Sequence, residues 1–505
     1  MLLTRMNRFR EPAQVLDSGF RSMRCLHSCP EKASEIENIV KLINEHSFPN
    51  QPLQPTLESH IPPASLSPSF VENVLGRLFG AHANGLKAYE FFKFCLLRSK
   101  DSPSAGAFEK TVHILTRMRY FDKAWDLMKE IQRTYPTLLT LKSMNIMLSR
   151  IAKHQSYEDT LEAFEKMERE IFVGKRFGTE EFNALIRAFC TQRQMKEAKS
   201  VFNKLHSRFS PNTKTMNILL LGFKEVGNVT AVELFYHEMV RRGFKPNHVT
   251  YNIRIDAYCK KGRLDDALRL LREMESVNCV PTLETMTTLI YGAGIARNIS
   301  KTGELFDEMT KRDLKPDVCA YNALLSSLLR SRDVKAAAAL MDEMDEKEIG
   351  HDHLTYHTMF WGFIRSEDMH GVQVLYTKMT ERGFLPTTRS VVMLMKFFCK
   401  NHSIDLGLSL WNYLVKQGQC PHGHALELLV TALCSHGRVE EALECSKQMV
   451  ERGRRLSELV FQMLKRILLE LGEEEKLHQL EQMAKKVEMF LPPPNVHRKA
   501  SVPCC

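Results

Sequence analysis

HVTYNIRIDAYCKKGRLDDALRLLREMESVNCVPT, residues 248–282, is the stretch that decides the fold of this chain. Its apolar residues first recur at helical spacing, and Lys261-Gly262 then interrupts the pattern. A second apolar stripe at helical spacing follows and ends at Met274, and Pro281 closes the stretch. The stretch therefore predicts a helix, a turn, a second helix and a loop.

The same unit recurs along the chain at a constant interval of 35 residues. A methionine and a proline mark the copies, at Met239, Met274, Met309, Met344 and Met379, and at Pro246, Pro281, Pro316 and Pro386. Such a period indicates a tandem array, because one helical hairpin cannot bury its own apolar stripes and completes its core by stacking on its neighbours. The sequence therefore predicts an all-α solenoid.

The repeat array is expected to span residues 69–490, as about 11 to 12 hairpins with atypical copies at both ends. Before the array, residues 41–68 read as a proline-rich linker, in which the prolines are expected to prevent regular helix. Residues 1–40 form a leader, and residues 491–505 a tail without regular structure. Positions are numbered 1 to 35 within each copy; the most regular copies span 141–178, 179–212, 213–247, 248–282, 283–317, 318–352, 353–387, 388–422 and 423–457.

The leader is rich in arginine and carries only two acidic residues before residue 28. Apolar residues lie between the arginines without forming the continuous core of a secretory signal, a pattern typical of an organelle transit peptide. Abundant arginine and sparse serine favour a mitochondrial address, with the chloroplast as the alternative, and a merely disordered basic leader also fits. No run of 18 or more apolar residues occurs, so we expect no membrane partner.

The net charge and the cysteine content exclude few classes of ligand or partner. The net charge of +10 suits a polyanionic partner but does not identify one. The chain has 13 cysteines and no Cys-x-x-Cys pair, and four of the cysteines share position 12 on the buried stripe of the first helix: Cys190, Cys259, Cys399 and Cys434. There cysteine acts as a small hydrophobic residue. We therefore expect neither a metal site nor a disulfide framework.

Several motifs identify the repeat type. Asn-Ile-Leu-Leu-Leu-Gly-Phe at Asn217, the segment that starts at Tyr251 and Tyr-Asn-Ala-Leu-Leu at Tyr321 resemble the pentatricopeptide repeat, as do the endings that start at Glu238 and Glu308. The uniform repeat length resembles the P-type class of plant organelles. The resemblance implies a right-handed α-solenoid superhelix that binds single-stranded organellar RNA, one base per repeat.

The resemblance also implies which residues read the bases: position 5 of each copy together with its last residue. Position 5 lies early in the first helix, out of phase with the buried stripe, so its side chain is expected to face the RNA. Pyrimidines are expected opposite Asn183 with Asn212, Asn217 with Asn247 and Asn252 with Thr282, guanine opposite Thr287 with Asp317, and uracil opposite Asn322 with Asp352. The expected core is YYYGU. An asparagine that only satisfies backbone groups near a helix start is the structural alternative.

Two further positions are expected to contact RNA. Position 2 should flank the bases through apolar contact, at Val249, Cys319 and Leu354. Position 13, at the end of the first helix, carries a cation in four copies: Lys260, Arg330, Arg365 and Lys400. Such cations can follow the phosphates or, alternatively, stabilise the helix C-terminus.

No catalytic motif accompanies the repeats. The zinc deaminase signature that ends some members of the family is missing after Ser457, and no phosphate-binding glycine loop occurs. We therefore expect no enzyme activity and no cofactor. The main hypothesis is a monomeric RNA-binding protein, working with RNA-processing proteins; the alternative is a helical scaffold that binds proteins.

Overall fold

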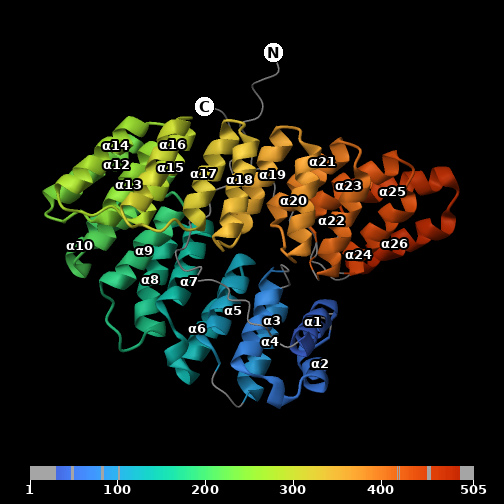
Figure 1. Ribbon diagram of the computed structural model, residues 1–505. Helices are drawn as coiled ribbons and strands as arrows, with labels where there is room; N and C mark the ends of the chain where they lie inside the picture. Colours follow the sequence, from blue (N-terminus) through green and yellow to red (C-terminus); the bar gives the residue numbers. More distant parts are fainter. Residues whose placement is uncertain are drawn as a thin grey trace, which may run out of the picture. The chain divides into compact units, whose positions relative to one another are not determined.

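The computed structural model describes residues 30–46, 51–80, 85–99, 103–417, 419, 421–451 and 456–488. These residues form helices and no β-strand (Figure 1). They fall in two compact units, the first drawn from residues 1–43 and 53–226 and the second from 44–52 and 227–505. The all-α prediction is confirmed. The basic leader up to residue 29 and the predicted tail lie outside the described residues.

The helices of the first unit follow one another along the chain with short connections (Figure 1). A π-helical turn, η3 (Met167–Ile171), continues α8, and two 3₁₀ turns occur at η1 (Pro63–Ser65) and η2 (Pro136–Leu138). The α-helices are α1 (Pro30–Glu45), α2 (Leu53–His60), α3 (Pro68–Gly80), α4 (Gly85–Arg98), α5 (Ala105–Arg117), α6 (Phe121–Thr134), α7 (Leu141–His154), α8 (Tyr157–Lys166), α9 (Thr179–Thr191), α10 (Met195–Phe209) and α11 (Thr213–Val226).

The second unit is more regular, and most of its helices have 13 residues. Its helices are α12 (Val229–Arg241), α13 (His248–Cys259), α14 (Leu264–Ser276), α15 (Leu283–Ile295), α16 (Ile299–Lys311), α17 (Val318–Arg330), α18 (Val334–Glu346), α19 (His353–Arg365), α20 (Met369–Glu381), α21 (Thr388–Lys400), α22 (Ile404–Lys416), α23 (Gly423–Ser435), α24 (Val439–Glu451), α25 (Glu458–Leu471) and α26 (Glu474–Glu488).

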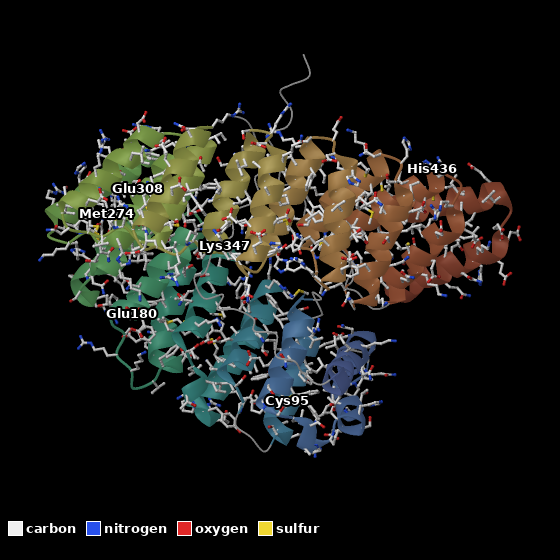
Figure 2. The ribbon with its side chains drawn as sticks, viewed as in Figure 1. Cys95, Glu180, Met274, Glu308, Lys347 and His436 are labelled. Atoms are coloured by element: carbon white, nitrogen blue, oxygen red, sulfur yellow. The ribbon has the colours of Figure 1, made fainter. Side chains whose placement is uncertain are left out.

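Each hairpin packs in the same way within its unit. The first helices of consecutive hairpins lie side by side, as α5, α7, α9 and α11 in the first unit and as α13 to α25 (odd numbers) in the second, and each second helix packs on its own first helix. The methionines that mark the repeat are fully buried in this core, including Met274 (Figure 2). The predicted array of helical hairpins is therefore confirmed in the described residues.

A left-handed residue ends each helix of the five hairpins between residues 213 and 387. At position 15 it is Gly262 in one copy (φ 70°) but Arg332 in another (φ 66°), and at position 31 it is Gly383 (φ 63°) or Glu348 (φ 55°). A residue with a Cβ adopts this conformation at a cost of roughly 1 kcal/mol, which the packing of the two helices must offset. The turn that Lys261-Gly262 predicts is thus present also in copies that lack the glycine.

The proline-rich stretch 41–68 differs from its prediction, because it contains the helix α2 (Leu53–His60). Pro55 lies in the first turn, where the backbone N–H has no helical acceptor and proline is tolerated. Leu53 and Leu57 are buried, and α2 packs on α4. The expectation that the prolines prevent regular helix is wrong for these residues, since apolar burial stabilises a helix that begins around a proline.

Neighbouring first helices approach closely where a glycine at position 10 faces position 12 of the preceding copy. A Cβ added at Gly222 would lie 2.9 Å from Cys190 Sγ, and one added at Gly292 would lie 2.7 Å from Cys259 Cβ. Burial raises the pKa of both thiols to about 12, so they are inert apolar fillers. The interpretation of position-12 cysteines as small hydrophobic residues is confirmed for these two.

Candidate functional site

The position-5 asparagines are almost fully buried. The exposed fraction is 2% for Asn183, 6% for Asn217, 5% for Asn252 and 3% for Asn322. The sequence predicts that these side chains leave the apolar stripe and face the RNA, and the structure leaves little of them exposed. In the structure the side chain of Asn252 lies against the first turn of the next first helix, where Thr285 covers it. The amides of Asn252 and Asn322 are therefore held at a junction between two hairpins.

In the five predicted pairs, the last residue of the copy caps the first helix of the next copy. Its side-chain oxygen accepts a hydrogen bond from the backbone N–H at position 3 of that helix, as a helix N-cap does. These bonds run to Asn212 from Thr215 (3.0 Å), to Asn247 from Thr250 (3.1 Å), to Thr282 from Thr285 (3.3 Å), to Asp317 from Ala320 (3.0 Å) and to Asp352 from Thr355 (2.8 Å). In the copy 318–352 the capping residue Asp352 lies beside the position-5 side chain of its own copy, Asn322.

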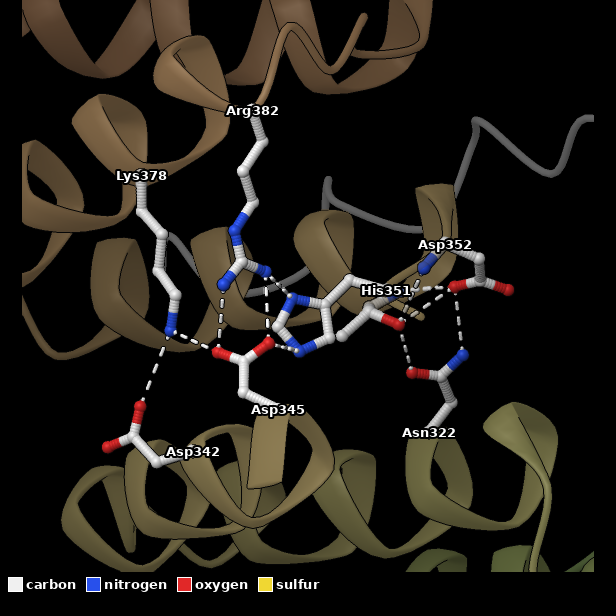
Figure 3. A network of polar contacts seen from close by, with 8 residues as sticks. Asn322, Asp342, Asp345, His351, Asp352, Lys378 and Arg382 are labelled. Atoms are coloured by element: carbon white, nitrogen blue, oxygen red, sulfur yellow. Dashed lines mark hydrogen bonds and ion pairs between the residues drawn. The ribbon is translucent and has the colours of Figure 1, made fainter. Parts of the chain in front are cut away.

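At the junction of α17 and α19 the two predicted base-reading residues touch (Figure 3). Asn322 Nδ2 donates a hydrogen bond to Asp352 Oδ1 at 3.0 Å. Thr355 Oγ1 donates to Asn322 Oδ1 at 2.8 Å and also lies 2.9 Å from Asp352 Oδ1. The Thr355 backbone N–H donates to Asp352 Oδ1. The three side chains thus form a closed network in which the orientation of the Asn322 amide is fixed.

The junction of α13 and α15 contains a similar but incomplete network. Thr285 Oγ1 donates to Asn252 Oδ1 at 2.6 Å and also lies 3.1 Å from the hydroxyl of Thr282. Asn252 Nδ2 is buried and has no hydrogen-bond partner in the described structure. A buried donor without an acceptor costs about 1–3 kcal/mol, so this amide retains an unused hydrogen-bonding group.

The predicted guanine junction lacks such a network. Thr287 Oγ1 is buried without a hydrogen-bond partner in the described structure, and the residue at position 3 of the next copy is Ala320, which offers no hydroxyl. Asp317 is exposed and caps α17. In the first unit, both amide atoms of Asn183 also lack a partner. The pair Asn217 and Asn247 divides between the two units, and its arrangement stays a prediction.

The predicted flanking residues are exposed although they are apolar. Val249 is 38% exposed and Leu354 54%, and Cys319 is also exposed. Each follows the first residue of its first helix, next to the capping residue of the preceding copy. These side chains therefore offer apolar surface beside the junctions that hold Asn252 and Asn322.

The four predicted position-13 cations lie at the ends of their first helices, but their surroundings differ. Lys260 pairs with Asp256 at 3.0 Å. The guanidinium of Arg330 lies 5.7 Å from the ring centre of Tyr291, and that of Arg365 lies 5.1 Å from that of Trp361. Lys400 ends α21 and is exposed. Three of the four therefore keep their charge without a carboxylate at ion-pair distance among the described residues.

A cationic cluster in the first unit was not predicted from the sequence. Arg150 Nη2 lies 2.8 Å from His113 Nε2, and the guanidinium of Arg117 stacks on Phe79 at 4.4 Å. Nε and Nη2 of Arg117, the pair that can hold an anion in a bidentate manner, are buried without a partner. Burial lowers the pKa of His113 to about 4, and the two arginines contribute to this shift. Arg117 occupies position 13 of the copy that starts at Ala105, which is the signal that could have identified it.

An ion-pair network stabilises the loop beside Asp352 (Figure 3). Asp345 accepts from Lys378 at 2.8 Å and from Arg382 at 3.0 Å. Its burial alone would raise its pKa, but these bonds outweigh burial and lower the pKa to about 2. His351, the residue before Asp352, lies 3.3 Å from Asp345 Oδ1. The network joins α18 and α20 and holds the loop from which Asp352 projects.

Two kinds of site are missing from the described residues. They contain no group of three or more His, Cys, Asp or Glu side chains that could hold a metal ion. None of the helices described is both long and apolar enough to cross a membrane.

Comparison with known proteins identifies the repeats. Profiles of the "PPR repeat" match residues 214–244, 242–275, 284–314, 354–384 and 428–454, and those of the "PPR repeat family" match 180–225 and 316–365. A pentatricopeptide repeat-containing protein of Arabidopsis thaliana is 57% identical over 96% of this chain and 97% of its own length. A second one, named mitochondrial, is 28% identical over 49% of this chain and 46% of its own length.

Among solved structures, the pentatricopeptide repeat protein PPR10 in complex with an 18-nt psaJ RNA element matches 90% of this chain and 69% of its own, at 17% identity and a TM-score of 0.41. The 57% identical relative extends over nearly the whole length of both chains. Together with the repeat profiles, it shows that this chain belongs to the pentatricopeptide repeat family.

Proposed function

We propose that this chain is a sequence-specific, single-stranded RNA-binding protein of mitochondria. Membership of the family supports RNA binding, since the related protein PPR10 was solved with a bound RNA element. The protein would stabilise an organellar transcript or serve its processing, splicing or translation by occupying it, together with RNA-processing proteins and without catalysis of its own. The regular 35-residue copies favour the P-type class.

One observation carries the proposal of base reading. In the copy 318–352 the two residues expected to read a base, Asn322 and Asp352, are hydrogen-bonded to each other, and exposed apolar side chains flank their junction at Cys319 and Leu354. A base inserted between the two flanking side chains would meet an amide and a carboxylate together. Such a pair matches the Watson–Crick edge of an unstacked base.

The bases assigned are YYYGU, read from the copy 179–212 to the copy 318–352. Asn252 supports a pyrimidine, because its amide N–H groups have no protein acceptor and can donate to the base. Thr287 with Asp317 is the less ordered pair, since the Thr287 hydroxyl and the Asp317 carboxylate are not linked by a hydrogen bond among the described contacts. The chain would therefore discriminate more sharply at uracil than at guanine.

Cations would contact the phosphates. Arg330, Arg365 and Lys400 end their first helices with no carboxylate partner among the described residues, and they are proposed as backbone contacts, together with Lys260. In the first unit, the unpartnered guanidinium edge of Arg117 extends this role. The net charge of +10 agrees with a polyanionic ligand.

The mitochondrial address rests on the arginine-rich leader and on relatives that are named mitochondrial. A fluorescent fusion of residues 1–40, expressed in plant cells, should co-localise with a mitochondrial marker. Co-localisation with chloroplasts would instead select the alternative address.

The binding proposal is tested by fluorescence anisotropy with a labelled RNA that contains YYYGU, at two salt concentrations. We expect binding that weakens with salt and that falls when the final GU is changed to AA or when DNA replaces RNA. Equal affinity for a scrambled RNA would overturn base reading, and no affinity for any RNA would favour the protein scaffold.

A further inference from the structure

We propose that the hydroxyl side chain at position 3 of a hairpin orients the base-reading residue of the hairpin before it, and so helps to decide which base is accepted. The inference rests on the proposed function. It concerns Thr285, Thr355 and Ser390, which are buried at three junctions of the second unit. None of these residues belongs to the pairs that are expected to read the bases.

The geometry of two junctions carries the proposal. Thr285 Oγ1 donates to Asn252 Oδ1 at 2.6 Å, and Thr355 Oγ1 donates to Asn322 Oδ1 at 2.8 Å. An amide has an acceptor on one side and two donors on the other, and the two orientations present opposite patterns to a ligand. A hydroxyl that occupies the oxygen turns the NH₂ group away from itself, so only donors remain for a base.

The remaining groups agree with the assigned bases. Asn252 keeps both N–H donors, which can bond the O2 carbonyl that cytosine and uracil share. At the other junction Asn322 gives one N–H to Asp352 Oδ1, which leaves its second N–H as a donor, and the second carboxylate oxygen of Asp352 bonds none of the described residues. A donor beside an acceptor matches the carbonyl and the N3–H of uracil. Both junctions share the hydroxyl, and the last residue, Thr282 or Asp352, separates a general pyrimidine site from a uracil site.

A third junction shows the same contact with His357, a position-5 residue to which no base is assigned. The hydroxyl of Ser390 lies 3.0 Å from His357 Nδ1 and 3.1 Å from the hydroxyl of Thr387. Burial lowers the pKa of His357, and Arg389 lowers it further, which favours the neutral ring. When the hydroxyl donates to Nδ1, the ring proton resides on Nε2. With that donation, the position-3 hydroxyl would here too select the hydrogen-bonding pattern that position 5 presents.

One junction of the chain lacks the position-3 hydroxyl. At the junction of α15 and α17, position 3 is Ala320, and the side chain that it faces, Thr287, has a buried hydroxyl without a partner. Asp317 still caps α17 at this junction, with an oxygen-to-nitrogen distance of 3.0 Å. Removal of the position-3 hydroxyl therefore leaves the cap intact but leaves the reading residue unoriented.

A purely structural role must be separated from this one, because the same hydroxyls complete the helix caps. Thr355 forms a capping box with Asp352, and Ser143 forms one with Thr140. Ser143 makes no hydrogen bond to a position-5 residue among the described contacts. A capping role predicts equal weakening toward all RNAs, whereas an orienting role predicts a change at one base only.

The test measures binding of the full chain to four RNAs that differ only in the base opposite the copy 318–352. Wild type should prefer uracil over cytosine, and Thr355→Val should reduce that preference about tenfold, the worth of one net hydrogen bond. Thr355→Ser, which keeps the hydroxyl, should restore the preference, and Ser143→Ala should leave it unchanged. Preferences at the other bases should remain in all three variants.

If Thr355→Val does not fold, Ala320→Ser provides the converse test, because it adds a hydroxyl opposite Thr287 and should sharpen the preference for guanine. An unchanged uracil preference in a folded Thr355→Val variant, or an unchanged guanine preference in Ala320→Ser, overturns the orienting role and leaves RNA reading intact. A wild-type chain that binds RNA without preference at this base overturns base reading and the orienting role together.

Discussion

The junction of Asn322, Asp352 and Thr355 and the cluster of His113, Arg117 and Arg150 are two polar groups with opposite properties. In the junction, hydrogen bonds to Asp352 and Thr355 hold the Asn322 amide in one orientation. In the cluster the donors crowd together, and two nitrogens of Arg117 have no acceptor. A satisfied network fixes a pattern and can confer specificity, whereas unsatisfied cations attract an anion of any sequence. We therefore expect substitutions in the junction to change base preference and substitutions in the cluster to change affinity for all RNAs.

The largest expected effect is the acid sensitivity of the cluster. Burial, with help from Arg150 and Arg117, lowers the pKa of His113 to about 4 in the folded chain. The unfolded chain binds this proton near pH 6.5, so stability is lost as pH falls from 6.5 to 4, by roughly 3 kcal/mol at most. Urea denaturation against pH should show this loss, and His113→Gln should reduce it. An identical pH dependence in the variant would contradict the assignment.

The second effect, about tenfold, concerns the satisfied junction. Asn322→Ala removes the amide but leaves Asp352 as the cap of α19. We expect the uracil preference to disappear, with affinity for uracil-containing RNA about tenfold lower. Thr287→Ala, in the unlinked junction, should change its preference much less. Anisotropy titrations with RNAs changed at one base measure both, and equal losses in the two variants would show that the network does not matter.

A smaller effect is expected from the cluster's charge. Arg150→Gln should weaken binding to all RNAs alike and reduce the slope of log affinity against log salt by about 0.7, the value for one phosphate of a single strand. Arg269→Gln makes the same charge change on the second helix α14, where Arg269 pairs with Asp266, and should leave the slope unchanged. A loss of RNA affinity in Arg150→Gln that depends on the base would contradict the distinction between the two sites.

The smallest expected effect is a difference in salt slope between two of the position-13 cations. Lys260 is already paired with Asp256, whereas Lys400 is exposed at the end of α21. Lys260→Gln should therefore change the salt slope less than Lys400→Gln does. The comparison needs one RNA and a salt series, and the reverse order would mean that ion pairing within a helix does not reduce contact with phosphate.

The sequence predicts the hairpins well because their signal is repeated. The period of the methionines identifies residues that are fully buried, and the interruption at Lys261-Gly262 marks a turn that the five copies between residues 213 and 387 all form. The pairing of Asn322 with Asp352 also follows from family and spacing, and the hydrogen bond between them agrees with it. Periodic features are thus recovered from one chain without its structure.

Features that depend on the next copy are not recovered. The burial of Asn252 arises because Thr285, 33 residues later, covers its amide, and periodicity within one copy does not reveal this. The cluster of Arg117 and Arg150 combines residues from two copies at different positions. Similarly, α2 forms in a proline-rich stretch because its leucines reach α4. None of these contacts can be predicted without knowing how closely neighbouring hairpins pack.

The contact between a glycine at position 10 and the side chain at position 12 of the preceding copy restricts how such arrays can be rearranged. Gly292 leaves no room for a methyl group beside Cys259, and Gly362 leaves none beside Leu329. A hairpin transplanted into another array keeps its fit only if its new neighbour supplies a compatible partner. A protein engineer who exchanges hairpins should therefore not treat one repeat as the module. The unit to keep together is the second half of one first helix and the second half of the next first helix, which contact each other.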